Sequence, residues 1–283
     1  MVGGLAGLTS LRTLSIEFQP LDELSDLNEG LEEERRLDLP MRAVLPALTE
    51  FVFCGKNKYL EDLMAQIDLP SVKDIKIKHH SALILDVPQL SRLIGRIARL
   101  QLVQFRHAQV TFGNLYSQIT LDRPQCERHQ VHFSLIMQIS ASDIDWNSDL
   151  DMCMCMAVVL GQFTAFFSNV RHLSFDSPQF WPEEMNCLDD SKLLPLLRLF
   201  PTVEELHVSG VLAGHIAPTL ENIAQERVIE VMPVLHSLWF DNDDEPVGSI
   251  ERFLSLRQLS GHPVTVRKGQ ADDMFDDSRP VNV

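Results

Sequence analysis

One nine-residue pattern of apolar and polar positions occurs six times along this chain. It reads φ-P-x-φ-x-x-φ-x-φ, where φ is apolar and Pro is frequent at the second position, and its clearest copy is FPTVEELHV at 200–208. The copies begin at Leu8, Leu45, Leu69, Phe167, Phe200 and Met232. The last three positions alternate with the period of a short strand that has one buried face. The first half predicts a turn into that strand, because Pro at this place removes no N–H from the strand pairing.

The later copies predict strands at 48–53, 72–77, 170–175, 203–208 and 235–240. Apolar residues at helical spacing follow several of them. In 57–67 they form one stripe: Tyr59, Leu60, Leu63, Met64 and Ile67. The segment 88–106 predicts a helix and then a strand around 102–106, and further helices are predicted at 190–199, about 215–229 and 249–261. Copies start 24 to 37 residues apart, except for one gap of 98, so the unit is a strand plus a helix.

We therefore predict an α/β fold over 1–268: a leucine-rich-repeat-like solenoid, with a curved parallel sheet backed by helices. The long gap predicts an irregular β segment at about 108–140, which we interpret as an antiparallel insertion flanking a degenerate repeat. The segment 150–167 is apolar nearly all round and predicts a buried helix, and 262–268 predicts a last edge strand. Two acidic segments remain, a short solvated helix within 20–40 and a disordered tail at 269–283.

Charge and cysteine content narrow the function classes. The formal net charge is -16, which argues against binding to nucleic acid or to anionic lipid. Five Cys without close pairing fit a reducing compartment, and we expect the protein in the cytoplasm or nucleus. The first residues lack the pattern of a signal peptide, and no apolar stretch approaches the length of a membrane span.

The repeat also predicts which side chains lie away from the helices. If each strand buries its two alternating apolar residues, the positions beside them form a continuous ladder on the concave face. That ladder contains Thr13, Ser15, Glu17, Glu50, Val52, Cys54, Asp74, Lys76, Lys78, His172, Ser174, Asp176, Glu205, His207, Ser209, Ser237, Trp239 and Asp241. We predict a partner-binding face made of Glu50, Asp74, Lys76, Lys78, His172, Asp176, Glu205, His207, Trp239 and Asp241. Trp239 has two interpretations, an anchor for a partner or a ring covered by a neighbouring loop.

Motifs for chemistry are not apparent. The common phosphate, dinucleotide, esterase and zinc-protease signatures do not occur. His129 and His132 would face opposite ways in a strand, and Cys153 and Cys155 would diverge on a helix. Asp189 and Asp190 suit the start of a helix, with a catalytic pair as the alternative, and the acidic run at 241–245 lacks the pattern of a calcium loop. We expect no enzyme activity, no cofactor and no bound metal.

Four phrases of this chain are distinctive: FPTVEELHV at 200–208, IAPTLENI at 216–223, EVMPVLHSLWF at 230–240 and FLSLRQLSGHPVTV at 253–266. With them, the chain resembles the C-terminal part of F-box-type proteins of mushroom-forming basidiomycete fungi. The resemblance covers nearly the whole chain from about Leu8. It implies a leucine-rich-repeat-like fold and an adaptor role, in which an F-box binds a cullin-RING ubiquitin ligase and the repeats select the substrate.

The chain departs from that family because too few residues precede Leu8 to form an F-box. We expect the native protein to extend upstream, and a ligase adaptor subunit is a partner only if that extension carries an F-box. Two hypotheses follow for this chain. One is the substrate-recognition region of a ubiquitin-ligase adaptor, and the other is a stand-alone scaffold or recognition protein unrelated to ubiquitin.

Overall fold

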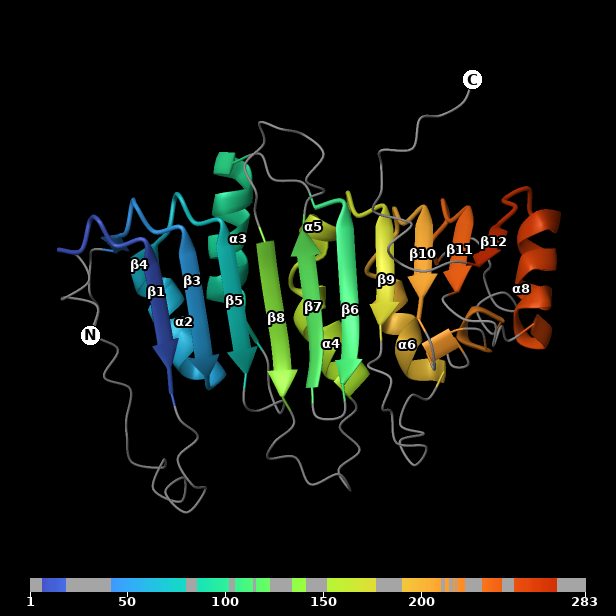
Figure 1. Cartoon of the computed structure of the whole chain (residues 1–283), viewed down its shortest axis with the longest axis horizontal. Coiled ribbons are helices and arrows are strands. Elements are labelled where there is room, and N and C mark those ends of the chain that lie inside the picture. Colours follow the sequence, from blue (N-terminus) through green and yellow to red (C-terminus); the bar gives the residue numbers. More distant parts are fainter. Residues whose placement is uncertain are drawn as a thin grey trace, which may run out of the picture.

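Ten strands form one sheet, and helices cover one of its faces (Figure 1). This computed structural model describes residues 7–18, 42–79, 86–101, 105–113, 116–122, 134–140, 152–176, 190–209, 212–213, 216, 218–221, 231–240 and 247–268. The strands of the sheet are β1 (Thr13–Glu17), β3 (Glu50–Gly55), β5 (Asp74–His79), β6 (His107–Gly113), β7 (Tyr116–Asp122), β8 (Ser134–Ser140), β9 (His172–Asp176), β10 (Glu205–Val208), β11 (Ser237–Phe240) and β12 (Thr265–Lys268). The helices are α2 (Asn57–Gln66), α3 (Pro88–Gln101), α4 (Met152–Gly161), α5 (Thr164–Phe167), α6 (Asp190–Leu197) and α8 (Val247–Leu259). The short strands β2 (Ala43–Val44) and β4 (Ile67–Asp68) form a separate parallel pair.

The spatial order of the sheet is β1-β3-β5-β8-β7-β6-β9-β10-β11-β12. All neighbours are parallel except at β7, which runs antiparallel to β6 and β8. In Figure 1 the arrow of β7 accordingly points opposite to the others. Along the chain, β5 is followed by α3 and then by β6, which lies three places from β5 in the sheet. The strands β7 and β8 fill the two places between them, and β8 pairs with β5. The irregular segment is therefore part of the same sheet, inserted in reversed order.

A turn opens each of the six copies of the repeat. In every copy the backbone N–H of the fourth residue donates to the carbonyl of the first, over 3.1 to 3.4 Å. The pairs are Leu11 to Leu8, Leu48 to Leu45, Val72 to Leu69, Val170 to Phe167, Val203 to Phe200 and Leu235 to Met232. This hydrogen bond confirms the predicted turn. The observed strands start at other residues than the predicted ones. Each strand begins about two residues later than predicted, because the fourth residue of the pattern still belongs to the turn.

Equivalent positions of neighbouring copies pair with one another. The carbonyl of the fifth residue of the pattern accepts two N–H groups of the next strand, at 2.8 to 3.2 Å. The carbonyls that do so belong to Arg12, Thr49, Arg106, Arg171 and Glu204. Arg106 lies immediately before β6, so β6 takes the place of the strand of a degenerate repeat. The pairing confirms the parallel register that the sequence predicts for β1, β3 and β5 and for β9, β10 and β11.

One apolar layer lies between the sheet and the helices. Both strand apolar positions are buried in β3, β5, β9, β10 and β11, and they pack with helix residues such as Leu60, Leu93, Val159, Leu196 and Phe253. In the edge strand β1 the same positions, Leu14 and Ile16, are only half-buried because no strand pairs with their outer side in the described part of the chain. None of the described helices has the length and apolar character to cross a membrane.

Two sequence predictions were wrong in detail. The strand predicted around 102–106 does not include Phe105 and Arg106, which precede β6 at His107, and residues 102–104 lie outside the described residues. The buried helix predicted at 150–167 is two helices, α4 and α5, and its burial is incomplete. Met154 and Val158 are exposed on α4, one turn apart on the side turned away from the sheet. The predicted acidic helix within 20–40, most of the helix at 215–229 and the tail at 269–283 lie outside the described residues.

Candidate interaction surface

We call the face of the sheet opposite the helices the open face (Figure 1). The strand register places three rows of side chains on it. Each row crosses the strands at one register position. The row at the strand starts contains Thr13, Glu50, Asp74, Ser134, His107, His172, Glu205, Ser237 and Thr265. The middle row contains Ser15, Val52, Lys76, Ile136, Thr120, Gln109, Ser174, His207, Trp239 and Arg267. The row toward the other end contains Glu17, Cys54, Lys78, Gln138, Gln118, Thr111 and Asp176.

Three charged residues gather on the N-terminal strands of the open face. The ammonium of Lys76 lies 3.1 Å from a carboxylate oxygen of Glu50, with 48% and 35% of the two side chains exposed. Lys78 is exposed next to Cys54, and its positive charge lowers the pKa of that thiol against the larger, raising effect of burial. An exposed pair such as Lys76 and Glu50 contributes little to stability.

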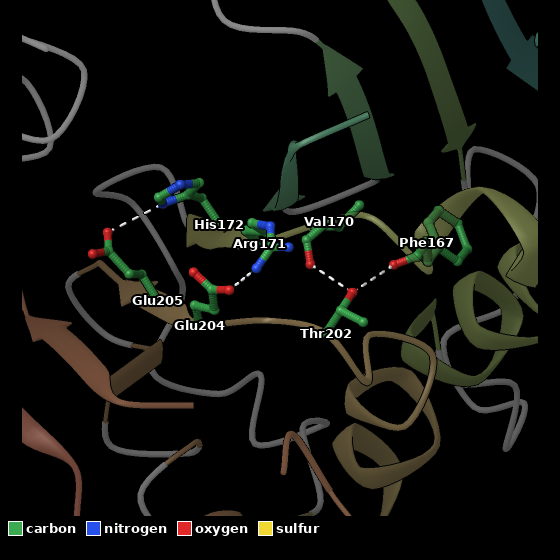
Figure 2. A network of polar contacts seen from close by, with 7 residues as sticks. All are labelled: Phe167, Val170, Arg171, His172, Thr202, Glu204 and Glu205. Atoms are coloured by element: carbon green, nitrogen blue, oxygen red, sulfur yellow. Dashed lines mark hydrogen bonds and ion pairs between the residues drawn. The ribbon is translucent and has the colours of Figure 1, made fainter. Parts of the chain in front are cut away.

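A histidine pair and a glutamate lie together on β6, β9 and β10. The rings of His107 and His172 are stacked with centroids 4.6 Å apart. The Nδ1 of His172 lies 3.1 Å from Oε2 of Glu205, as Figure 2 shows. This hydrogen bond holds the pKa of Glu205 below its ordinary value and outweighs the opposite effect of burial. Positive charge on His172, His236 and Arg267 acts in the same direction.

Replacing His172 by Phe is expected to raise the pKa of Glu205 toward its ordinary value, because Phe keeps the ring but removes the donor. With its lowered pKa, Glu205 contributes stability above the ordinary pKa of Glu and loses it as the pH falls through the lowered value. The variant should therefore lose less stability on acidification than the wild type. A carbon-13 NMR titration of the Glu205 carboxyl measures the change directly. His236→Phe is the control with a smaller expected rise, since His236 acts through charge alone. An unchanged pKa in His172→Phe would contradict the assignment.

Ser174, His207 and Asp176 lie together without forming a catalytic triad. The hydroxyl of Ser174 donates to Asp176 at 3.3 Å and lies 3.2 Å from Nδ1 of His207. The hydroxyl has one proton and cannot donate it to Asp176 and to Nδ1 of His207 at once, and the role of Nδ1 depends on the tautomer of His207. A triad needs the carboxylate on the imidazole and the imidazole as base toward the hydroxyl. Here the carboxylate of Asp176 contacts the hydroxyl of Ser174.

His207 and Ser237 correct the predicted exposed ladder. Both have the predicted register, yet His207 is 3% exposed and Ser237 1%. His207 is flanked by Ser174 on one strand and by Trp239 on the other, and these neighbours in the middle row cover its ring. The predicted exposure of His207 and Ser237 was therefore wrong.

Trp239 is half-buried, and Arg267 of the edge strand β12 lies 5.0 Å from its ring centroid. The indole N–H is buried and has no hydrogen-bond partner among the described residues. Arg267 therefore lies against the ring, and both interpretations of Trp239 stay predictions. Asp241, the next predicted position, lies outside the described residues.

A set of backbone-directed contacts keeps β9 and β10 aligned below the surface. The hydroxyl of Thr202, in the turn before β10, reaches the carbonyls of Phe167 and Val170 at 3.2 and 3.0 Å. Arg171 and Glu204 form an ion pair across the strand starts. Figure 2 shows these contacts as one line that ends at His172 and Glu205. The strand starts of adjacent repeats are therefore held in register by side chains as well as by the sheet.

The structure brings some predicted residues together and separates others. It pairs Glu50 with Lys76 and His172 with Glu205, while Asp74 is half-buried on β5 and belongs to neither pair. Sequence reasoning missed Gln109, whose amide donates to Asp176, and His107, which stacks on His172. The strand pattern around Ala108 and Val110 was a sufficient signal for the side-chain faces of β6, but its pairing with β9 was not foreseeable.

No protein-family model, curated protein or solved structure matches this chain. The fold itself defines the class: a mixed α/β protein with a large, mostly parallel sheet backed by helices on one side. Within the described ranges, no three His, Cys, Asp or Glu side chains gather in a way that could hold a metal ion.

Proposed function

We propose that this chain is a protein-interaction module whose partner lies across the open face. One observation carries the proposal: equivalent polar and charged positions are in register from β1 to β12, on the side of the sheet that the described helices leave uncovered. A partner that lies across the strands would contact several repeats at once. This arrangement suits a solenoid, which recognises through its continuous surface.

The leucine-rich-repeat-like character is supported by the six turns with one common hydrogen bond and by the equivalent pairing of successive copies. The reversed order of β6, β7 and β8 is a departure from a simple stack of repeats. The link to ubiquitin rests on the sequence resemblance to F-box-type proteins. On that basis we propose that the module selects substrates for a cullin-RING ligase.

The test compares the 283-residue chain with a version extended upstream along the genomic reading frame. Both are expressed with an affinity tag in cells of the source organism, and co-purified proteins are identified by mass spectrometry. We expect the extended version to recover the ligase adaptor subunit and the cullin, and the shorter chain to recover neither. A variant with charge changes on the open face, such as Lys78→Glu, should keep the adaptor subunit and lose the substrate.

Two outcomes would overturn the ligase role. The upstream frame could encode no segment with the helical pattern of an F-box, or the extended version could never recover the adaptor subunit. If proteins sensitive to open-face substitutions still bind in either case, the chain is a stand-alone scaffold unrelated to ubiquitin. Recovery of no protein sensitive to the open face would contradict the interaction role altogether.

A further inference from the structure

Part of the row toward the other strand ends has a positive charge at Lys78, a negative charge at Asp176 and neutral polar groups between them, with Cys54 and Glu17 beyond Lys78. We call it the bipolar row, and it contains Lys78, Gln138, Gln118, Thr111 and Asp176. Each residue lies on the strand next to that of its neighbour in the row, so the series crosses β5, β8, β7, β6 and β9 in order.

The two charges of the bipolar row are not neutralised by the described part of the chain. Lys78 is exposed and forms no ion pair there. The carboxylate of Asp176 accepts hydrogen bonds from Gln109 and Ser174, which are both uncharged. On the same face Lys76 is paired with Glu50 and Glu205 with His172.

The middle of the row suits the backbone of an extended peptide. Gln138, Gln118 and Thr111 are half-buried, so their polar ends are restrained but remain within reach of solvent. Glutamine amides and threonine hydroxyls both donate and accept hydrogen bonds. They can therefore pair with the N–H and C=O groups of a peptide that crosses the strands, whatever its side chains are at those positions.

The distance between Lys78 and Asp176 sets the number of residues between the two charged side chains of a peptide that would contact both. Adjacent strands lie about 4.8 Å apart, so four steps from β5 to β9 span about 19 Å. An extended peptide rises about 3.3 Å per residue, which makes this span about six residues. Side chains six positions apart in an extended chain point to the same side. Both could face the sheet together.

We propose that the open face binds an extended peptide segment with an acidic residue over Lys78 and a basic residue over Asp176, about six positions apart. The inference rests on the proposed interaction function and specifies its partner. Charge complementarity at both ends favours this occupant over a nucleic acid or an anionic membrane, because either of those would be repelled by Asp176 and by the net charge of -16.

The experiment uses random twelve-residue peptides displayed on phage and selected on the 283-residue chain. Enriched peptides are then synthesised with a fluorescent label, and their dissociation constants are measured by anisotropy. We expect the enriched peptides to share an acidic and a basic residue about six positions apart. Lys78→Glu and Asp176→Lys should each weaken binding by about fivefold or more. The double variant Lys78→Glu/Asp176→Lys should prefer peptides in which the acidic and basic residues are exchanged.

Matched controls separate the row from general charge effects. Lys73→Glu and Glu251→Lys change exposed charges outside the row and should leave affinity within about twofold. Asp176→Asn removes the charge while keeping an acceptor for Gln109 and Ser174, so it tests the charge if Asp176→Lys unfolds the chain. Circular dichroism and thermal melting report the folded state of each variant.

Several results would overturn the inference. Selection could enrich no peptide, or peptides without the paired charges, or peptides that bind Lys78→Glu and Asp176→Asn as tightly as the wild type. A natural partner from the co-purification test that keeps its affinity for both variants would also reject the bipolar row. In that last case the proposed interaction function stands, because the partner still binds, and only this mode of recognition fails.

Discussion

Leu206→Ala is expected to lower the free energy of unfolding by about 2–5 kcal/mol, which is the usual cost of truncating a buried leucine. Leu206 is 0% exposed and lies on the helix side of β10, between Leu173 of β9 and Leu238 of β11 in the register. Its loss would leave a cavity in the apolar layer at a place where three strands meet. Chemical denaturation followed by circular dichroism measures the change.

Leu259→Ala is the matched control, because it removes the same atoms from a leucine that is 84% exposed at the end of α8. We expect a change within about 0.5 kcal/mol. Reversal of charge at Lys76 and Lys78 on the open face should stay within about 1 kcal/mol. Comparable losses at Leu206 and at these surface positions would mean that the assignment of the two sheet faces is wrong.

Glu61→Ala is expected to lower the free energy of unfolding by about 1–3 kcal/mol. The carboxylate of Glu61, on α2, accepts the backbone N–H groups of Gln89 and Leu90 at 2.7 and 3.1 Å. These N–H groups belong to the first turn of α3, where a helix offers them no backbone acceptor of its own. The helix α3 begins at Pro88 and has no acidic residue in that turn. One helix therefore caps the next, and Ala would remove the cap. Denaturation measurements as for Leu206 provide the value.

Asp62→Ala is the control, since Asp62 is the exposed neighbour of Glu61 on the same helix. We expect a change within about 0.5 kcal/mol. Glu61→Gln should cost less than Glu61→Ala, because the amide oxygen still accepts from the first turn of α3. Equal losses in Glu61→Gln and Glu61→Ala would show that the cap depends on the charge and not on the acceptor.

The pH dependence gives a second measure of Glu61. Burial raises its pKa, with a smaller rise from Asp86, and the two backbone N–H groups lower it only in part. A raised pKa in the folded state means that its contribution is fully present below the ordinary pKa and declines as the pH rises through the raised value. The stability difference between wild type and Glu61→Gln should accordingly move in favour of the variant as the pH rises through that range.

The candidate surface was only partly foreseeable. Its strand positions and faces came from the repeat, and Lys76, Lys78, His172 and Glu205 have the register that the pattern predicts. The bipolar row could not be predicted from the repeat, because Gln118 and Gln138 belong to the irregular segment, whose strand order no periodicity indicates. The burial of His207 was missed because it depends on residues of neighbouring strands. An alternating pattern tells which side of the sheet a residue is on, and the size of its neighbours across the sheet decides how much of it is covered.

The sequence by itself determined the turns, the strands and the buried positions of the repeats. Each of these depends on residues within nine positions of one another, so the alternation of Leu206 and Val208 was a sufficient signal. Only the tertiary structure decided that β8 lies beside β5, that β6 lies beside β9, and that Glu61 caps α3. Those contacts join segments far apart in the chain, and many strands with similar apolar faces could have paired there. Packing of the whole sheet against its helices selects one arrangement among them.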